Sequence, residues 1–285
     1  MQAGKHSRPA ACLLASLPAC RLACAFAGQS AGQPAWLSAS PLAPWLADVL
    51  VSQYADWCAS WRGVLQRGGR RMILALTNSK GGVGKSTLAV HLAAWGQEQG
   101  WRTALVDADA QGASSLWLQE ASPQTPVFRL QTPDEILDQV PRLALEFTLV
   151  VVDGPAGLSE VTRAILLVAN RTLLPCGPSA LDLRAAYEAL RVVRQAQLIR
   201  TGPPEVLLVP NKLQVQFRLT RELLNSLASI GCPTVTGLRL RQAYADAVGQ
   251  GTVVWRLGDR AAAATAEIKQ LFQELTIHDG QPHLD

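Results

Sequence analysis

The sequence lacks two kinds of feature: the long apolar runs of membrane proteins and the paired cysteines of metal-binding sites. No stretch of its 285 residues approaches the ~20 consecutive apolar residues that span a bilayer. Its six cysteines, at positions 12, 20, 24, 58, 176 and 232, form no C-x-x-C pair. We therefore expect reduced thiols in a cytoplasmic protein with no membrane span and no iron–sulphur cluster.

Residues 1–71 show little of the strand and helix alternation that follows them, and they are rich in Ala, Leu, Pro, Trp and Cys. We expect a poorly ordered or partly helical extension. Three interpretations stay open: translated sequence upstream of a start at Met72, an amphipathic docking helix over 44–66, and a secretory signal, which Pro18 and Arg21 interrupt. The expected division is this extension, a domain over 72–275 and a tail over 276–285.

From Met72 onward, short apolar runs alternate with helix-length segments. The run Leu149–Val152 is typical of a strand buried on both faces. The pattern predicts an α/β fold with a doubly wound, mostly parallel sheet flanked by helices. Strands are expected at 72–77, 103–107, 147–152, 171–175, 205–210 and 234–238, with weaker candidates at 126–131 and 252–255. Helices are expected at 86–99, 133–145, 158–169, 180–200, 219–230, 241–249 and 259–275.

A glycine-rich loop, Asn78–Thr87, lies between the first expected strand and the first expected helix. Its sequence is NSKGGVGKST. In this setting, backbone N–H groups and the positive end of the helix favour phosphate oxygens. Lys85 supplies an ammonium for the β and γ phosphates of a nucleotide, and Ser86 is expected to ligate Mg²⁺. The predicted phosphate-binding residues are Gly81, Gly82, Val83, Gly84, Lys85, Ser86 and Thr87.

Carboxylates follow two of the other expected strands. Asp107 and Asp109 are one residue apart, so in an extended segment both face the same side. They either point toward the γ-phosphate and Mg²⁺ or form an acidic loop that caps the next helix. Asp153 ends a buried strand, where a carboxylate needs a partner, and Mg²⁺ bound through water would provide one.

The phosphate loop departs from the usual G-x-x-x-x-G-K-[ST] pattern, because Ser79 stands where the first glycine is usual and Lys80 follows it. In this respect the sequence, over about residues 72–275, resembles the deviant Walker A ATPases, the family of ParA and MinD. The segment Asp107–Gly112 is also similar to that family's D-x-D-P-Q-G pattern, with Ala110 in place of proline. The resemblance implies a slow, partner-stimulated ATPase that uses ATP and Mg²⁺.

The resemblance also implies roles for individual residues. Lys80 would reach across a nucleotide-sandwich homodimer to the partner's phosphates. Asp109 would position or activate the attacking water. Asp107, together with Ser86 and Asp153, would bind the Mg²⁺ ion, with Asp107 in its outer coordination shell. Asn211, at the end of the strand over 205–210, would hydrogen-bond the adenine; the alternative is a turn-forming asparagine beside Pro210.

Charge is unevenly distributed along the chain. Residues 184–260 carry eleven basic and five acidic side chains, whereas residues 72–183 have a net charge of −4. This asymmetry hints at a polyanionic partner, and the resemblance implies nonspecific DNA bound by the ATP dimer. A solvated arginine surface is the alternative. The candidate DNA-binding residues are Arg218, Arg221, Arg239, Arg241 and Arg256, with Arg260 in the same segment.

The end of the chain helps to choose within the family. The expected last helix carries one lysine and is followed by a polar, acidic tail, so no stable membrane association is expected. We expect a cytoplasmic, nucleoid-associated ATPase that segregates or positions a plasmid, a chromosome or a protein assembly such as a carboxysome, with a cargo-linked activator protein. The alternatives are a MinD-like membrane-positioning ATPase and an ATP-dependent synthetase or amidotransferase.

Overall fold

The computed structural model describes residues 71–214 and 216–277. The interpretations of the N-terminal extension, apart from its last residue, and of the tail over 278–285 fall outside these ranges. Within them, no helix combines the length and the apolar character needed to cross a membrane.

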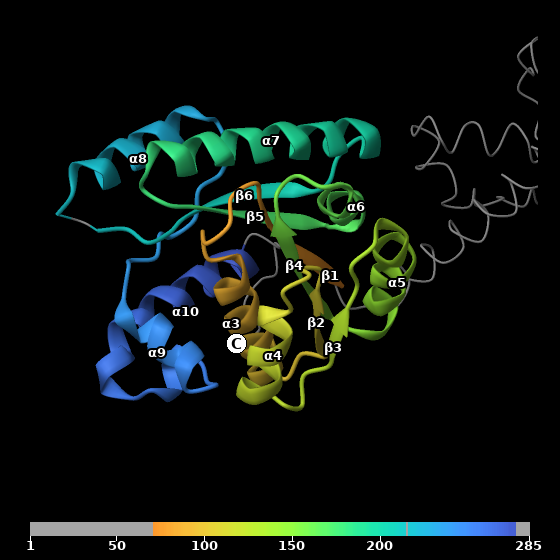
Figure 1. Cartoon of the computed structure of the whole chain (residues 1–285), viewed down its shortest axis with the longest axis horizontal. Helices are drawn as coiled ribbons and strands as arrows, with labels where there is room; N and C mark the ends of the chain where they lie inside the picture. Colours follow the sequence, from red (N-terminus) through yellow and green to blue (C-terminus); the bar gives the residue numbers. More distant parts are fainter. Residues whose placement is uncertain (1–70, 215, 278–285) are drawn as a thin grey trace, which may run out of the picture. The chain divides into compact units, whose positions relative to one another are not determined.

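The centre of the described region is a six-stranded sheet in which every pair of neighbouring strands is parallel (Figure 1). Its strand order is β3-β2-β4-β1-β5-β6, so β1 lies between β4 and β5. This confirms the predicted doubly wound fold. The strands are β1 (Met72–Asn78), β2 (Thr103–Asp107), β3 (Val127–Arg129), β4 (Leu149–Ala156), β5 (Arg171–Cys176) and β6 (Glu205–Pro210).

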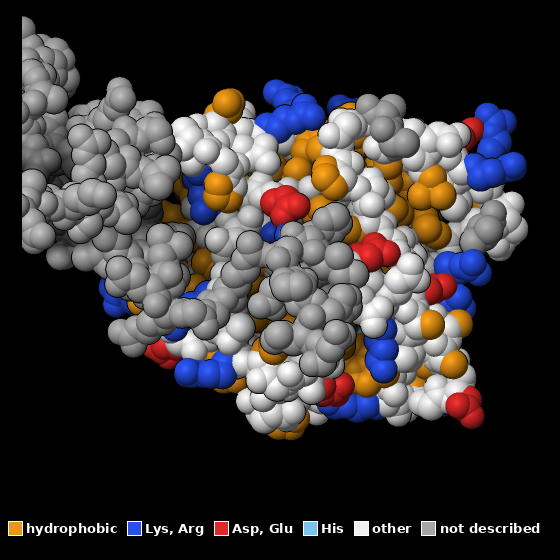
Figure 2. Space-filling view, turned by 180° about the vertical axis from the view of Figure 1, so that it is seen from behind, with side chains coloured by type: hydrophobic (Ala, Val, Ile, Leu, Met, Phe, Trp, Pro, Cys, Tyr) orange, Lys and Arg blue, Asp and Glu red, His pale blue; other side chains and the backbone are white. Residues whose placement is uncertain are grey.

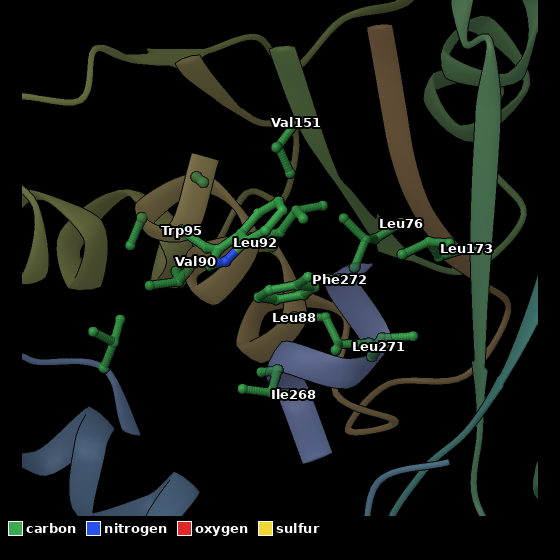
Figure 3. Close-up of a cluster of buried hydrophobic side chains, with 14 of the residues drawn as sticks. Leu76, Leu88, Val90, Leu92, Trp95, Val151, Leu173, Ile268, Leu271 and Phe272 are labelled. Atoms are coloured by element: carbon green, nitrogen blue, oxygen red, sulfur yellow. The ribbon is translucent and has the colours of Figure 1, made fainter. Parts of the chain in front are cut away.

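Helices cover both faces of this sheet, because successive side chains of a strand point to opposite sides. On one face, Leu74 and Leu76 of β1 belong to a core shared with α3 (Lys85–Glu98), α4 (Ala113–Ala121), α9 (Gln242–Gly249) and α10 (Ala262–Ile277). In Figure 3, Phe272 of α10 lies beside Leu88 of α3 within this core.

The opposite face of the sheet packs against the other helices. Ile73 and Ala75 of β1 belong to a core with α5 (Pro133–Glu146) and α6 (Glu160–Val168). Strands β5 and β6 pack there against α7 (Ala180–Arg200) and α8 (Arg218–Ser229). The carboxyl ends of the strands are left free by both layers, which is where parallel sheets bind ligands.

Three segments differ from the sequence-based expectations. Residues 234–238 run beside β6, but they form only an isolated bridge, between Thr234 and Leu208. The next ladder bond would need an N–H from Pro210 of β6, and proline has none. Residues 252–255 do not form a strand: a 3₁₀ turn over Val254–Arg256 buries Val254 instead. Helix α4 was not expected; it follows the carboxylate pair directly and buries Trp117 and Leu118.

Candidate functional site

The phosphate loop joins the carboxyl end of β1 to the first turn of α3. Gly82 and Gly84 have φ angles of 72° and 101°, which glycine adopts without strain. A Cβ atom at Gly82 would meet nothing within 4 Å, so the loop opens to solvent there. At Gly84 it would lie 2.3 Å from Nδ2 of Asn211, so this position has no space for a side chain. Gly81 is exposed, whereas Val83 is buried.

Hydrogen bonds hold the phosphate loop in place. Asn78 Nδ2 donates to the carbonyl oxygen of Pro175 at 2.7 Å, and its Oδ1 accepts the N–H of Lys80 at 3.0 Å. The ammonium of Lys85 is buried and donates to the carbonyl oxygen of Lys80 at 3.2 Å. Burial lowers the pKa of Lys85, and the nearby carboxylates of Asp153 and then Asp109 partly oppose this. Lys85 therefore carries a desolvated charge that an anionic ligand would stabilise.

Two further residues of the phosphate loop contact α7. The ammonium of Lys80 lies 2.6 Å from Oδ1 of Asp182, in the first turn of this helix. The hydroxyl of Ser79 donates to the carbonyl oxygen of Ala185 at 3.1 Å, about one turn beyond Asp182. Lys80 is therefore paired within its own subunit.

Asp107 and Asp153 lie side by side, because they are register partners at the ends of β2 and β4. Asp107 is fully satisfied: Oδ2 accepts the N–H and the hydroxyl of Ser115 at 2.8 and 2.6 Å, and Oδ1 accepts the N–H of Asp109 at 3.1 Å. Its side chain therefore holds the start of α4. Sequence reasoning missed Ser115, because the helix that carries it was not expected.

Asp153 has the opposite surroundings. It is completely buried, yet neither carboxylate oxygen accepts a hydrogen bond, and the hydroxyl of Ser114 is likewise without a partner. Burial raises the pKa of Asp153 to about 6; the nearby hydroxyls of Ser86 and Ser114 act against this shift, although neither is placed to form a well-aligned bond. An ionised carboxylate without a partner is costly at this depth.

These orphaned oxygens fit a hydrated divalent cation beside the half-buried hydroxyl of Ser86. Mg²⁺ binds hard oxygen ligands and usually keeps several waters, so it needs few protein ligands when nucleotide phosphates supply the rest. The described part of the chain contains no group of three or more His, Cys, Asp or Glu side chains that would form a metal cage of protein ligands alone. The residues at this site therefore fit Mg²⁺ carried by a nucleotide.

Asp109 lies half-exposed in the loop between β2 and α4, and its Oδ1 accepts the N–H of Gln111 at 3.0 Å. Position 110, where the family pattern has proline, is alanine in this loop. A guanidinium N–H of Arg129 donates to the carbonyl oxygen of Ala110 at 3.2 Å, and the same guanidinium lies against Gly112. This contact with β3 gives the loop a support that the sequence pattern did not reveal.

Asn211 follows β6 and lies against the phosphate loop. Its Nδ2 donates to the carbonyl oxygen of Val83 at 2.7 Å, and its Oδ1 accepts the N–H of Lys212 at 2.9 Å. Beside it is a small pocket of about 60 Å³, also lined by Thr87, Leu238 and Tyr244. Asn211 thus lies between a partly apolar pocket and the phosphate loop, and its amide hydrogen-bonds that loop.

The five candidate DNA-binding arginines have different surroundings. Arg239 and Arg241 line the same pocket, and both pair with Glu267, at 3.5 and 2.7 Å. Arg218 pairs with Glu222 and Arg256 with Glu98. Arg221 is exposed and forms no ion pair with any described residue. On the face in Figure 2, basic side chains of the described region lie in separate groups with acidic ones between them.

Strand β1 leads through a glycine-rich loop into a helix. A buried lysine lies at the end of this loop, and a carboxylate without a hydrogen-bond partner lies on the neighbouring strand of the sheet. This arrangement is suited to binding phosphate groups. Fold and loop together define the class of P-loop nucleotide-binding proteins.

Comparison with known proteins narrows this class. Residues 74–254 match the model of the CobQ/CobB/MinD/ParA nucleotide binding domain, and the chain belongs to this family. It is 34% identical to the maintenance of carboxysome distribution protein A of Halothiobacillus neapolitanus over 71% of this chain and 95% of that protein. The protein of the same name from Gloeobacter kilaueensis is 32% identical, over 71% and 93%.

Solved structures agree on the fold. An ATP complex of McdA from Cyanothece superposes with a TM-score of 0.64 over 76% of this chain and 100% of that one, at 15% identity. At such low identity the likeness supports the fold alone.

Proposed function

We propose that the chain is an ATPase that dimerises around two Mg²⁺–ATP molecules, binds nonspecific DNA as that dimer, and positions a protein assembly of the carboxysome kind. The observation that carries the nucleotide part is the orphaned carboxylate of Asp153 beside Ser86 and the buried Lys85. The cargo part is supported by the two carboxysome-distribution relatives, each matched over more than nine-tenths of its length.

In this proposal the residues of the loop bind the phosphates. The glycines expose backbone N–H groups, and Lys85 places its ammonium on the β and γ phosphates. Ser86 would ligate Mg²⁺, and Asp153 and Asp107 would bind it through water. When bound, Mg²⁺ would neutralise the charge that develops during hydrolysis. Asp109, half-exposed above them, orients the attacking water.

Adenine recognition is assigned to the pocket beside Asn211. Its lining combines apolar side chains, among them Leu238, with the amide of Asn211, a mixture suited to a flat purine with polar edges. Because Arg239 and Arg241 line this pocket as well, they could affect nucleotide binding in addition to DNA binding. Arg221 is the better first probe of DNA contact, since it is exposed and unpaired among the described residues.

Lys80 is assigned to the second subunit's nucleotide. Contacts of this kind exist only in the pair, so ATP shifts the population from monomer to homodimer, and a cargo-linked activator would reverse the shift by stimulating hydrolysis. DNA binding by the dimer would place the protein on the nucleoid in the cytoplasm. A synthetase or amidotransferase would instead turn over ATP without dependence on DNA, and a MinD-like protein would bind liposomes with ATP.

The proposal is tested with the full-length protein and a fluorescent duplex of arbitrary sequence, in the presence of Mg²⁺ with ATP, with ADP or without nucleotide. Binding should require ATP and weaken steeply with salt. Lys85→Ala should abolish ATP and DNA binding together, whereas Lys269→Ala, which removes an exposed lysine of α10, should leave ATP binding unchanged. Equal DNA binding under all three nucleotide conditions would contradict the proposed cycle.

The DNA contact and the cargo need separate tests. Arg221→Ala should weaken DNA binding for all sequences alike and reduce the salt slope by about 1, while ATP binding stays unchanged. In cells that make the protein, Lys85→Ala should leave fluorescently labelled carboxysomes clustered instead of distributed. Normal distribution in those cells would refute the cargo assignment without touching the nucleotide site.

A further inference from the structure

The segment that carries Asp109 is a tight turn. The N–H of Gly112 donates to the carbonyl oxygen of Asp109 at 3.0 Å, so Asp109–Gly112 are the four residues of a β-turn. Oδ1 of Asp109 accepts the N–H of Gln111 at 3.0 Å, which closes a smaller ring inside the turn. The position of this carboxylate therefore depends on whether the turn is formed.

Ala110 occupies the second position of the turn. Proline is favoured at this position because its ring presets the backbone angle φ at about −65°. Alanine leaves φ free when the turn is not formed, so forming the turn costs more conformational entropy. Ala110 is exposed, and no described residue accepts a hydrogen bond from its N–H. The backbone of the turn thus lacks the constraint that a proline would give, although it has room for one.

Arg129, the last residue of β3, supports the turn from outside. β3 is the edge strand beside β2, and Arg129 is the register partner of Asp107 (Figure 1). Its guanidinium donates to the carbonyl oxygen of Ala110 at 3.2 Å. A Cβ atom at Gly112 would lie 3.0 Å from both Cζ and Nη2 of this guanidinium. Arg129 therefore contacts the second and the fourth residue of the turn at once.

The guanidinium of Arg129 has no acidic partner. It is exposed and forms no ion pair with any described residue. A charged guanidinium makes a stronger hydrogen bond than a neutral donor, and its plane can pack against one residue while it bonds another. A lysine ammonium has no such plane. The contacts of Arg129 therefore act on the shape of the turn.

We propose that Arg129 is a positioning residue for hydrolysis. By holding the turn Asp109–Gly112 it supplies the constraint that the family pattern places in a proline at position 110, and so keeps the Asp109 carboxylate where it orients the attacking water. This inference rests on the proposed function, in which Asp109 has that role. Its consequence is that Arg129 controls the rate of hydrolysis without touching the nucleotide.

The experiment measures ATP hydrolysis of the full-length protein by phosphate release at saturating Mg²⁺–ATP. Arg129→Ala should lower kcat about threefold to tenfold, the effect of losing one hydrogen bond that orders a reacting group. Calorimetry with a non-hydrolysable ATP analogue should give a dissociation constant within about twofold of the wild type, because the interaction acts on the rate and not on binding. Arg129→Lys keeps the charge but loses the planar contact with Gly112, so its kcat should lie between the two.

Ala110→Pro distinguishes a role in the turn from a general role in packing. In the Arg129→Ala background it should raise kcat about twofold to fivefold, because proline at a compatible position lowers the entropy lost on ordering the turn. In the wild type it should change kcat by less than about twofold, since Arg129 already keeps the turn formed in most molecules. A general loss of packing would not be corrected by a substitution in another element.

Arg163→Ala is the matched control. It removes another exposed guanidinium with one hydrogen bond, at 3.0 Å to Oε1 of Gln195, and should leave kcat unchanged. Asp109→Ala should remove most of the hydrolysis, and adding Arg129→Ala to it should cause no further loss, because both substitutions act on the same carboxylate. Thermal unfolding of each variant identifies any loss of folding.

The outcomes distinguish the inference from the function on which it rests. A wild-type protein that does not hydrolyse ATP, or Asp109→Ala with the wild-type rate, would refute the proposed function and the inference together. If the wild type hydrolyses ATP and Asp109→Ala does not, a wild-type kcat in folded Arg129→Ala overturns the inference alone. A loss of kcat that Ala110→Pro leaves uncorrected, or an equal loss of affinity for the analogue, would also overturn it.

Discussion

Replacing Asp153 with asparagine should make the protein more stable while destroying its binding of Mg²⁺–ATP. The ordinary pKa of this carboxyl is 3.8, and burial raises it to about 6 in the folded protein. Below pH ~3 the group is protonated in both states and costs nothing. As the pH rises from about 3 to 6, the unfolded chain releases this proton whereas the folded protein retains it, so stability falls. Above pH ~6 the folded protein also ionises, now as a carboxylate without hydrogen bonds, and the cost stays constant.

The size of this cost follows from the separation of the two pKa values. One pH unit corresponds to ~1.4 kcal/mol, so the charge on Asp153 costs the folded protein about 3 kcal/mol at pH 7.5. At pH 4.5 the cost is about 1 kcal/mol, because most of the folded molecules keep the proton. An asparagine amide in the same place also lacks partners, so part of the gain is lost and Asp153→Asn should add about 1–3 kcal/mol at pH 7.5.

The assay is urea unfolding of the full-length protein without nucleotide or Mg²⁺, at pH 7.5 and pH 4.5. The advantage of Asp153→Asn over the wild type should fall by about 2 kcal/mol between these pH values. Asp138→Asn, which removes an exposed partner of Arg142, is the control and should change stability by less than about 0.5 kcal/mol at both. A variant less stable than the wild type at pH 7.5, or an advantage independent of pH, would refute the reasoning.

Three further predictions concern the phosphate loop, the helix that follows it and the loop after β2. Gly84→Ala should weaken ATP binding at least about tenfold in calorimetry, because the new methyl group meets the Asn211 amide. Gly157→Ala is the control: its φ is similar but a methyl group there meets nothing, so ATP affinity should not change. Equal ATP affinities of the two variants would contradict this. Burial lowers the pKa of His91 to about 4, so between pH 7 and 5 the unfolded chain takes up a proton that the folded protein does not. The free energy of unfolding should therefore fall by about 2 kcal/mol over this range in urea unfolding, and this fall should be absent in His91→Gln. Asp109→Ala should bind ATP but persist as a dimer in gel filtration, and wild-type hydrolysis would exclude the role of Asp109.

Local chemistry made part of this site predictable from the sequence. The glycines, Lys85 and Ser86 lie within a few residues of one another, and a strand before them and a helix after them are visible in the apolar pattern. The positions of Asp107 and Asp153 were also predictable, since strand ends meet at one edge of a parallel sheet. What the sequence could not reveal was their difference: Ser115 satisfies Asp107, while Asp153 has no partner.

The contacts that escaped prediction join residues far apart in the chain. Lys80 and Asp182 are separated by 102 positions, and Arg129 and Ala110 meet only because β3 pairs with β2. Lys80, Asp182 and Arg129 each resemble, on their own, an ordinary charged surface residue. The segment 234–238 misled for another reason, because an apolar alternating run beside a sheet edge looks like a strand whether or not its backbone completes the ladder.

The attachment of the phosphate loop to α7 also has a mechanical consequence. A helix of 21 residues is about 30 Å long, since each residue adds ~1.5 Å. A tilt of about 5° at the end held by Ser79 would carry the opposite end through nearly 3 Å, following that length. Leu198 and Ile199 lie at that opposite end with 79% and 73% of their surface exposed. A tilt of α7 too small to disturb a nucleotide at the phosphate loop would thus displace the exposed apolar side chains at the other end of this helix by several times as much.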